Sequence, residues 1–461
     1  MLGQRPGGGG PPAAAGPEWT APAASGPVRA RLELPGSKSI TNRALILAAL
    51  ADSPTQVIHP LRARDTELMA GAISALGATI TEQAGDWLVT PGWRDAPATV
   101  DVGNAGTVLR FVPPTAALAP ADVAFSGDER AAQRPVGPLL DALAQLGAQI
   151  SDDGRRAVPF TVRGRGRMPG GSVTLDASGS SQLVSGLLLA AARYDKGAEI
   201  RHEGPPVPSA PHLAMTVTML RAAGAGVEAA GPGGAAGMGR SGSAVWRVHP
   251  GVLSPGRIEV EPDLSNAGPF LAAALATGGE VTIAGWPARS LQAAGQILDA
   301  LTAMGATCTP EPGGLRVTGP QTVRGVSADL RDISELMPVL VALAACADSP
   351  STFTGIGHMR THESDRLAVL ARQLGAMGGD VTELPDGLQV RPRPLRAAPA
   401  PFDPHDDHRM VMAAAVLGLT VPGLRVTNAA TVGKTMPGFF TLWQQLLGPA
   451  AAPPEPPETA R

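Results

Sequence analysis

The segment Pro35–Ser39 and the residues that follow it have the composition of an anion-binding site. Lys38 and Ser39 stand just before a predicted helix, and Arg43 follows about one turn later. Backbone N–H groups at a helix start, hydroxyls and cationic side chains together favour a negatively charged ligand. The G-x-x-x-x-G-K pattern of a nucleotide-binding P-loop does not occur there. A serine that caps the helix beside ordinary surface charges is the alternative interpretation.

The segment Gly103–Thr107 also leads into a predicted helix. Gly106 would let a ligand approach the backbone closely, and the Asn104 amide can donate or accept a hydrogen bond. A tight turn explains this segment equally well. Arg130 and Arg134 follow in the same part of the chain and add cationic side chains.

A third helix start, within Ser178–Gln182, is rich in hydroxyls. It contains Ser180, Ser181 and Gln182, and a helix cap would account for only one of these serines. Such a start suits a phosphate or the hydroxyls of a sugar. Ser209, which lies between two prolines, would add a further hydroxyl, with a plain turn as the alternative.

Acids and cations are concentrated in Asp332–Glu335 and in His358–Arg366. On a helix, His362 and Arg366 would lie one turn apart on the same face. Paired acids near cations are what general acid–base chemistry at neutral pH requires. Zinc is the competing interpretation, but His358 is not followed by the Glu of the H-E-x-x-H pattern and the arginines would repel a metal ion.

Two more cations stand near the end of the chain. Arg409 heads an apolar helix, which is a costly place for a charge unless it faces a ligand. Lys434 is one of only three lysines, with Lys38 and Lys196. A lysine retained in an arginine-rich chain is expected where a compact point charge is needed. Lys196, between Asp195 and a glycine, is typical of a turn instead.

A repeating pattern of helices and strands must position these segments. A short phrase that reads as a helix end, a glycine C-cap and a strand start recurs roughly every 70 to 80 residues. Its copies are Leu76–Ile80, Leu146–Ile150, Ala223–Val227, Met304–Cys308 and Met377–Val381.

Apolar helices, each followed by a short loop and a strand, also recur. They are Arg43–Leu50, Val108–Leu118, Leu183–Ala192, Phe270–Ala276, Pro338–Ala345 and Met410–Leu417. They are apolar almost all round, so they should be buried. Six such units predict two α/β domains of three units each, with a boundary near Glu261–Asp263. Pro113 and Pro114 should kink the second helix or end it early.

Composition excludes several classes of protein. The chain has 461 residues and a net charge of −3, which favours two domains and argues against a nucleic-acid partner. No apolar run approaches the roughly 18–20 residues of a membrane span. Residues 1–27 are rich in Gly, Pro and Ala and lack the pattern of a secretory signal, so they predict a disordered tail, as do residues 448–461. Cys308 and Cys346 are expected to be core residues in a reducing cytoplasm.

In this order, the segments resemble the 5-enolpyruvylshikimate-3-phosphate (EPSP) synthase family, or 3-phosphoshikimate 1-carboxyvinyltransferases. The motifs PGSKSITNRAL, GNAGT, SSQ, HESDRL, DHRM and GKTMPGFF carry the resemblance, which covers Arg29 to Leu447. It implies an α/β fold of two inside-out α/β barrels (prisms), each of three βαβαββ modules. The chain would cross between them near Gly36 and Glu261. One domain would then comprise residues 28–36 with 262–447, and the other residues 37–261.

The resemblance also implies an activity. The enolpyruvyl group of phosphoenolpyruvate would pass to the 5-hydroxyl of shikimate-3-phosphate through a tetrahedral intermediate, with release of phosphate, in chorismate and aromatic amino acid biosynthesis. The implied partners are these two small molecules, without nucleic acid, membrane, metal or organic cofactor. The enzyme would be a cytoplasmic monomer.

Site residues are carried over motif by motif. Shikimate-3-phosphate would be bound by Lys38, Ser39, Arg43, Ser180, Ser181, Gln182, Ser209, Glu335 and His362. Phosphoenolpyruvate would be held by Lys38, Asn104, Gly106, Arg130, Arg366, Arg409 and Lys434. Glu363 and Lys38 would exchange the proton at C3, and a second carboxylate would act as the base. Counting back from Glu363 without gaps places that base at Glu335, with Asp332 as the alternative.

The sequence departs from the better-known family pattern at three positions. Glu335 stands for an Asp, His362 for a Lys and His358 for an Asn. The histidine at 362 would add a titration near neutral pH. A related transferase, which acts on a UDP-linked amino sugar, usually opens with Lys-Asn and commonly has a reactive loop cysteine. A non-catalytic repeat protein that binds anions would not need carboxylates among its cations.

Overall fold

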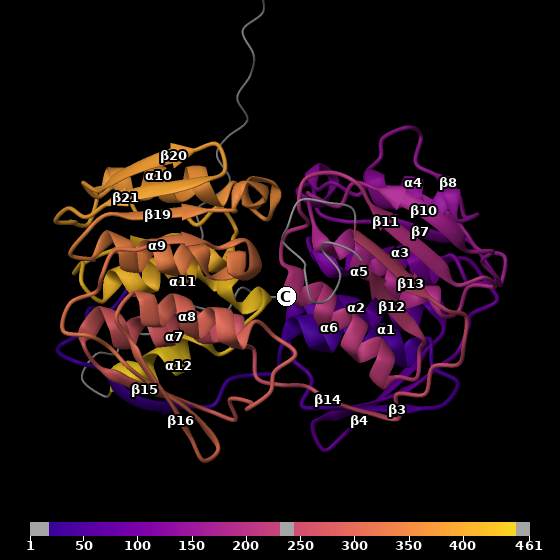
Figure 1. Ribbon diagram of the computed structural model, residues 1–461, viewed down its shortest axis with the longest axis horizontal. Coiled ribbons are helices and arrows are strands. Elements are labelled where there is room, and N and C mark those ends of the chain that lie inside the picture. The colour runs from indigo at the N-terminus through magenta and orange to yellow at the C-terminus, as the bar shows by residue number, and fades with distance from the viewer. Residues whose placement is uncertain (1–17, 231–243, 449–461) are drawn as a thin grey trace, which may run out of the picture.

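The computed structural model describes residues 18–230 and 244–448. Two lobes lie side by side, one built mainly from the first half of the described chain and the other mainly from the second (Figure 1). In each lobe, helices occupy the interior and small sheets lie around them. The predicted α/β fold of two inside-out barrels is confirmed.

The first lobe contains six α-helices and twelve strands among the described residues. Its helices are α1 (Lys38–Ala49), α2 (Arg64–Leu76), α3 (Gly106–Ala116), α4 (Gly137–Gln145), α5 (Ser181–Ala191) and α6 (Ala210–Ala222). Its strands are β3 (Thr55–Ile58), β4 (Thr79–Gln83), β5 (Asp86–Thr90), β6 (Ala98–Asp101), β7 (Val123–Ser126), β8 (Gln149–Ser151), β9 (Phe160–Arg163), β10 (Gly171–Leu175), β11 (Ala198–His202), β12 (Val227–Ala230), β13 (Ala244–Val248) and β14 (Arg257–Glu259). A 3-10 helix, η1, spans Ala131–Gln133.

The second lobe has the same kind of composition. Its helices are α7 (Leu264–Thr277), α8 (Ala294–Ala303), α9 (Met337–Ala345), α10 (Arg366–Ala376), α11 (His408–Gly418) and α12 (Phe439–Leu447). Its strands are β1 (Trp19–Thr20), β2 (Arg29–Leu32), β15 (Glu280–Ala284), β16 (Thr307–Glu311), β17 (Gly314–Thr318), β18 (Ser327–Asp329), β19 (Ser351–Thr354), β20 (Asp380–Leu384), β21 (Gly387–Arg391) and β22 (Arg425–Val426). Its 3-10 helices are η2 (Arg331–Leu336), η3 (Gly357–Thr361) and η4 (Ala429–Lys434).

Five sheets share one topology, of which β6-β7-β9-β8 is an example. The first two strands of each are parallel and the remaining pairs are antiparallel, as a βαβαββ unit requires. In two units the first strand comes from a distant segment: β14 pairs with β3, and β2 pairs with β15. The sixth predicted unit differs, because the described residues there form the two-stranded sheet of β1 and β22 and a single bridge between Phe402 and Val426.

The tail predicted over residues 1–27 is partly wrong. Residues 1–17 lie outside the described residues, but the rest of this segment belongs to the fold. Trp19 pairs with Val426 and packs against the ring of Phe440, with the centroids 4.9 Å apart. The Ala21 N–H donates to the carbonyl of Leu424 at 2.8 Å. Burial of Trp19 and Ala21 therefore anchors this segment against the second lobe. Of the C-terminal tail, residues 449–461 are outside the described residues.

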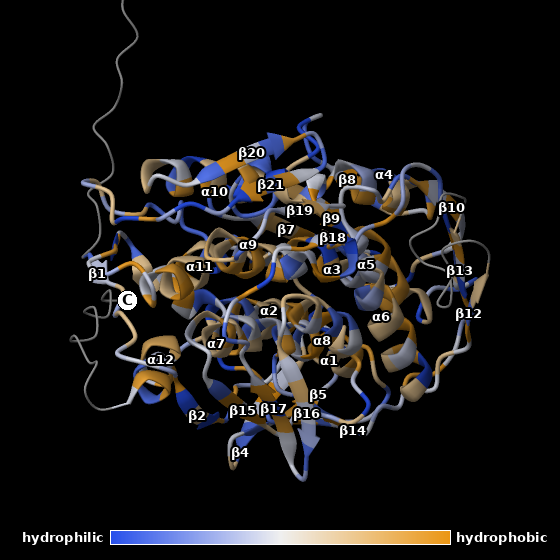
Figure 2. Ribbon diagram, turned by 60° about the vertical axis from the view of Figure 1, so that its left-hand side comes forward, coloured by the Kyte–Doolittle hydropathy of each residue, from blue (hydrophilic) through white to orange (hydrophobic). Residues whose placement is uncertain are grey.

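The inner helices are buried on all sides, as their apolar sequences predicted. Every residue of α9 and α11 is buried, and both helices take the hydrophobic end of the colour scale in Figure 2. None of the helices in the described ranges has the length and apolar character needed to cross a membrane. The glycines of the five recurring phrases all have positive φ, which confirms their predicted role after helix ends. The two cysteines are free thiols and are only partly buried.

Helix α3 runs through Pro113 and Pro114 and ends at Ala116, so these residues do not stop it where they stand. Pro114 has no N–H, and the carbonyl of Arg110 therefore lacks its usual helical donor. Helix α5 packs closely against α3 at this carbonyl. A Cβ on Gly186 of α5 would lie 2.1 Å from the Arg110 oxygen, so only glycine fits this contact.

The chain passes between the lobes at two adjacent points. Gly36 and Pro262 form an antiparallel bridge, and the Ser37 N–H donates to the carbonyl of Glu261 at 2.8 Å. One hydrophobic core runs from Ile40 to Val260, and the other combines residues before 33 with residues after 263. We propose that these cores define the two predicted domains, 37–261 and 28–36 with 262–447, and that residues 18–27 join the second.

Candidate functional site

The predicted site residues gather where the two lobes meet, at the starts of several helices. Lys38, Gly106 and Ser181 are the first residues of α1, α3 and α5 in the first lobe. In the second lobe, Arg366 begins α10 and Arg409 is the second residue of α11. Helix starts carry partial positive charge and unpaired N–H groups. The arrangement therefore favours anionic ligands even before the side-chain charges are considered.

A small cavity of about 60 Å³ lies between the lobes. Five residues predicted to bind shikimate-3-phosphate line it: Lys38, Ser39, Gln182, Ser209 and Glu335. Asp332, His212 and Arg409 line it as well. Hydroxyl, amide, carboxylate and cationic groups therefore meet in one enclosed space.

A second cavity, of about 940 Å³, contains four other predicted residues: Asn104, Arg130, Glu363 and Lys434. The lobes touch at its edge, where the Lys434 ammonium group donates to the carbonyl of Asn104 at 3.2 Å. Three predicted phosphoenolpyruvate residues, Asn104, Arg130 and Lys434, thus line the large cavity, while Lys38 and Arg409 of the same set line the small one.

Lys38 is held by groups from both lobes. Its Nζ donates to Asp65 Oδ2 at 3.1 Å, and its backbone N–H donates to Asp263 Oδ2 at 3.1 Å. Burial alone would lower the pKa of Lys38, but Asp65, Glu363 and Glu335 outweigh this effect and raise it. Lys38 is therefore a protonated ammonium group beside the small cavity.

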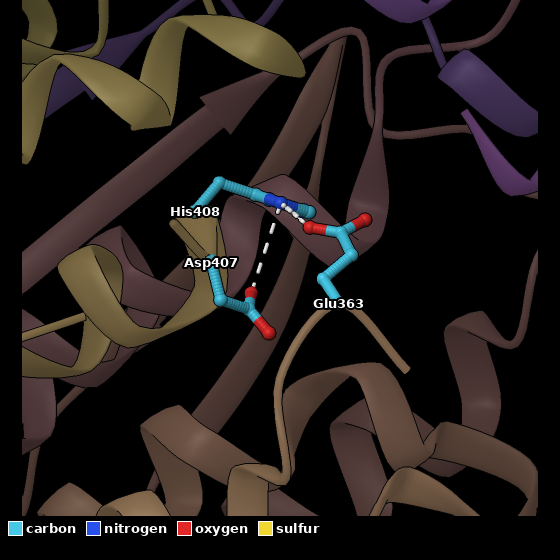
Figure 3. A group of neighbouring side chains, drawn as sticks. All are labelled: Glu363, Asp407 and His408. Atoms are coloured by element: carbon cyan, nitrogen blue, oxygen red, sulfur yellow. Dashed lines mark hydrogen bonds and ion pairs between the residues drawn. The ribbon is translucent and has the colours of Figure 1, made fainter. Parts of the chain in front are cut away.

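Glu363 lies between a lysine and a histidine. Its Oε1 is 3.2 Å from Lys434 Nζ. Its Oε2 is 2.8 Å from His408 Nδ1, as Figure 3 shows. Burial opposes ionisation, but Lys434 and His408 hold the pKa of Glu363 well below its usual value. Burial also lowers the pKa of His408. Because the ionised Glu363 carboxylate can only accept, His408 Nδ1 is the donor of this hydrogen bond.

Glu363, Asp407 and His408 lie close enough together to be considered as metal ligands. Their oxygens, however, already accept hydrogen bonds from cations and N–H groups. Asp407 accepts hydrogen bonds from Arg366 Nε at 2.7 Å and from the Arg409 backbone N–H at 3.0 Å. Lys434 faces Glu363. These cations repel a metal ion, so the donor set fits an ion-paired network better than a metal site.

The structure separates the two candidate bases by their surroundings. Glu335 Oε2 accepts a hydrogen bond from Arg366 Nη1 at 3.1 Å and lies 3.5 Å from Arg409 Nε. Burial by itself would raise the pKa of Glu335. Arg366 and Arg409 outweigh this effect and hold that pKa well below its usual value. Asp332 accepts from the Ala210 N–H at 3.3 Å, and burial raises its pKa. Glu335 is therefore the carboxylate within the cationic cluster.

Three other predicted residues lie beneath the small cavity. Arg43 is fully buried, where it donates to Thr216 Oγ1 at 2.7 Å and to the Ser39 carbonyl at 2.9 Å. Burial lowers the pKa of Arg43 to about 9. Ser180 caps α5 and Ser181 follows it, both buried. None of these three side chains lines either cavity in this arrangement of the lobes.

Arg130 and Arg134 have different surroundings. Arg130 donates from Nε to the Glu363 carbonyl at 3.1 Å and from Nη2 to the His362 carbonyl at 3.0 Å, so it bridges the lobes. Arg134 is buried and donates to the Asn104 carbonyl at 2.8 Å. A Cβ on Gly106 would lie 2.4 Å from Arg134 Nη2, so Gly106 makes room for that guanidinium. Arg134 was missing from the predicted phosphoenolpyruvate set.

Burial lowers the pKa of three histidines near the site, His212, His358 and His362. Burial and Arg366 lower the pKa of His362 well below its usual value, so the expected titration of His362 near neutral pH is wrong for this state. Burial lowers the pKa of His358 and of His212 to about 4. His212 lies in the wall of the small cavity and was not predicted, because a histidine between Pro211 and Leu213 carries no sequence signal.

Comparisons with known proteins show the family to which this chain belongs. Residues 22–443 match the family model of EPSP synthase (3-phosphoshikimate 1-carboxyvinyltransferase). The chain belongs to the EPSP synthase family. A 3-phosphoshikimate 1-carboxyvinyltransferase of Kocuria rhizophila is 48% identical over 442 residues, which cover 93% of this chain and 96% of the relative. The enzyme of that name from Mycobacterium ulcerans is 46% identical over 436 residues, covering 93% of this chain and 97% of the relative.

Solved structures agree on the fold of the family. An EPSP synthase from Acinetobacter baumannii superimposes with a TM-score of 0.74 at 24% identity, covering 92% of this chain and 97% of that one. At this identity the likeness concerns the fold alone. The family membership inferred from the motifs is thus confirmed by sequence relatives of nearly the same length.

Proposed function

We propose that this protein transfers the enolpyruvyl group of phosphoenolpyruvate to the 5-hydroxyl of shikimate-3-phosphate and releases phosphate. Membership of the EPSP synthase family supports this activity. The single structural observation that supports it best is the meeting of Lys38, Glu335 and Glu363 with four cations at the lobe interface. Those cations are Arg134, Arg366, Arg409 and Lys434.

The two cavities support a division of binding roles. In the proposal, the small cavity widens to bind shikimate-3-phosphate. The ligand then lies against Lys38, Ser39, Gln182, Ser209 and Glu335, with Arg43, Ser180, Ser181 and His362 close by. Phosphoenolpyruvate lies between the two cavities, held by Lys38, Asn104, Gly106, Arg130, Arg366, Arg409 and Lys434. Of these, Asn104, Arg130 and Lys434 line the large cavity, and Lys38 and Arg409 line the small one. We add Arg134 to this second set, since its guanidinium faces Gly106. Cations placed around the phosphate stabilise the charge that develops on it.

The protonation states support a division of catalytic roles. In the addition step, Glu335 accepts the hydroxyl proton as the oxygen bonds to C2, and the Lys38 ammonium group donates a proton to C3. In the elimination step, the Glu363 carboxylate takes a proton from C3 while the C2–phosphate bond breaks. A protonated Lys38 and an ionised Glu363 are the forms that these steps need.

We also propose that the protein is a monomer located in the cytoplasm. The two free thiols support the cytoplasm as the location. Burial raises the pKa of Cys308 and of Cys346, and neither lines the site cavities. The transferase that uses a reactive loop cysteine is therefore disfavoured.

The test is an assay of the purified protein with both substrates. Phosphate release and a product heavier by the carboxyvinyl group, measured by mass spectrometry, are expected. Lys38→Met should reduce kcat by at least about 10²-fold, as expected for loss of a proton-transfer group, while circular dichroism stays unchanged. Lys196→Met removes an exposed lysine of a turn and should leave turnover intact. Absence of phosphate release by the wild-type protein would refute the proposed activity.

A further inference from the structure

Arg366 has only one guanidinium nitrogen that is not committed to Asp407. Its Nε and Nη2 donate to the Asp407 carboxylate at 2.7 and 3.2 Å. Both side chains are buried, Arg366 with 1% and Asp407 with 0% of the side-chain surface exposed. The remaining nitrogen, Nη1, donates to Glu335 Oε2. An anion that pairs with Arg366 through Nη1 therefore competes with the Glu335 carboxylate.

Arg409 faces the same carboxylate oxygen from another helix. Its Nη1 donates to the Ser265 carbonyl at 2.9 Å, while its Nε is buried and has no hydrogen-bond partner among the described residues. The distance from this Nε to Glu335 Oε2 is 3.5 Å. A buried guanidinium N–H without a partner is costly, and it points to an acceptor that fits better than Glu335 does.

Glu335 is the partner that can move. Its side chain is 25% exposed, against 1% for Arg366 and 6% for Arg409. It belongs to the 3-10 helix η2, which contains a non-helical residue at Ile333. It also lines the small cavity, so a carboxylate released from the arginines has space beside Lys38 and Gln182.

We propose that Glu335 occupies the anion position of Arg366 and Arg409 while the site is empty, and that phosphoenolpyruvate displaces it. The displacement frees Glu335 to accept a proton from the acceptor hydroxyl. This inference rests on the proposed function and deepens it, because it links binding of one substrate to activation of the base for the other. Loss of its cationic partners also makes the carboxylate a stronger proton acceptor.

The length of the side chain offers a sharp test. An aspartate at 335 keeps the charge but is shorter by one methylene, about 1.5 Å, so its carboxylate cannot reach Arg366 Nη1 from the same backbone position. Asp332 provides a matched control, since it is an acid of the same 3-10 helix that bonds to the Ala210 N–H rather than to either arginine.

The experiment measures the dissociation constant of phosphoenolpyruvate by calorimetry, without shikimate-3-phosphate, for the wild type, Glu335→Asp, Glu335→Gln and Asp332→Asn. We expect both Glu335 variants to bind roughly 3- to 30-fold more tightly, because the competing ion pair is gone. Asp332→Asn should bind within about twofold of the wild type. Thermal unfolding of each variant shows whether it is folded.

Two results would overturn the inference. An unchanged or weaker affinity of folded Glu335→Asp would show that Glu335 does not compete with the ligand. Tighter binding by Glu335→Gln and Asp332→Asn, but not by Glu335→Asp, would indicate a general effect of negative charge. Turnover by the wild type is measured in parallel. With turnover present, either result removes the inference alone, whereas absence of both turnover and binding removes the proposed function with it.

Discussion

His212 and His358 are held neutral inside the protein, and this has a consequence for stability. Burial lowers the pKa of both to about 4 in the folded state, whereas an exposed histidine in the unfolded chain has a pKa of about 6.5. Below about pH 6.5 the unfolded chain therefore binds protons that the folded protein does not. Above that pH neither state binds them, and these histidines contribute no pH dependence.

We therefore predict that the free energy of unfolding falls as the pH is lowered from about 6.5 towards 4. At pH 5 the loss should be about 1–2 kcal/mol for each histidine. Urea unfolding of the wild type and of the double variant His212→Asn, His358→Asn, at pH 7 and pH 5, measures it. The double variant should show a flatter dependence, while His59→Asn, at an exposed position, should behave as the wild type. Equal slopes in all three proteins would contradict the prediction.

The sequence predicted, from residue types and order, many of the residues that the structure brings together at the lobe interface. It could not separate Arg130 from Arg134, because both lie in one short segment and nothing in their spacing shows which side chain faces the other lobe. The structure resolves this: Arg130 reaches the carbonyls of His362 and Glu363, while Arg134 is buried beside Gly106. His212 was missed for a similar reason, since its role depends on contacts across the fold.

At the scale of helices and strands, periodic features were predictable and short ones were not. The recurring glycine phrases placed helix ends and strand starts, because a positive φ strongly favours glycine. Strand β1 has two residues and follows a segment rich in Gly, Pro and Ala. It is too short to show the alternation of polar and apolar residues that predicts a strand. Helix α3 passes through two prolines because tertiary contacts with α5 and Tyr194, whose hydroxyl donates to the Pro114 carbonyl at 2.9 Å, support that stretch.

The contact between α3 and α5 should tolerate no side chain at Gly186. Gly186→Ala would place a Cβ 2.1 Å from the Arg110 carbonyl oxygen. We therefore expect the free energy of unfolding, measured by urea denaturation, to fall by about 3 kcal/mol. Gly71→Ala is a matched control in α2, where a Cβ meets nothing within 4 Å. It should raise stability by up to about 1 kcal/mol, since alanine favours the helix. Equal effects of the two substitutions would argue against a close helix contact.

At the scale of the whole molecule, hydrogen bonds across the interface hold the two lobes together in this structure. Arg130 donates to two carbonyls of the second lobe, Lys434 donates to Asn104, and the Ser209 N–H donates to the Arg331 carbonyl at 2.9 Å. The carbonyl of Glu363 is one of these acceptors. Contact between the lobes therefore fixes the backbone of a proposed catalytic residue, so that closure and assembly of the site are one event.

Arg130→Ala should loosen this closure. The guanidinium makes two charge-assisted hydrogen bonds to the 362–363 backbone, each worth about 1.5–3 kcal/mol. We expect the substrate-free variant to have a larger radius of gyration in small-angle scattering and a kcat about 10- to 100-fold lower, because Glu363 is less well placed. Arg130→Lys keeps the charge but not the planar guanidinium group. Its kcat and radius of gyration should lie between those of the wild type and those of Arg130→Ala.

The control is Arg64→Ala, which removes another arginine of the large cavity. Arg64 pairs with Asp128 within its own lobe at 2.9 Å, so its loss should change neither the radius of gyration nor kcat. The pattern of kinetic effects also separates the two roles considered for Arg130. A direct contact with phosphoenolpyruvate predicts a raised KM with an unchanged radius of gyration. If Arg130 instead holds the lobes together, its loss should lower kcat and expand the molecule. The geometry of Glu363 would then depend on contacts that only the closed protein makes.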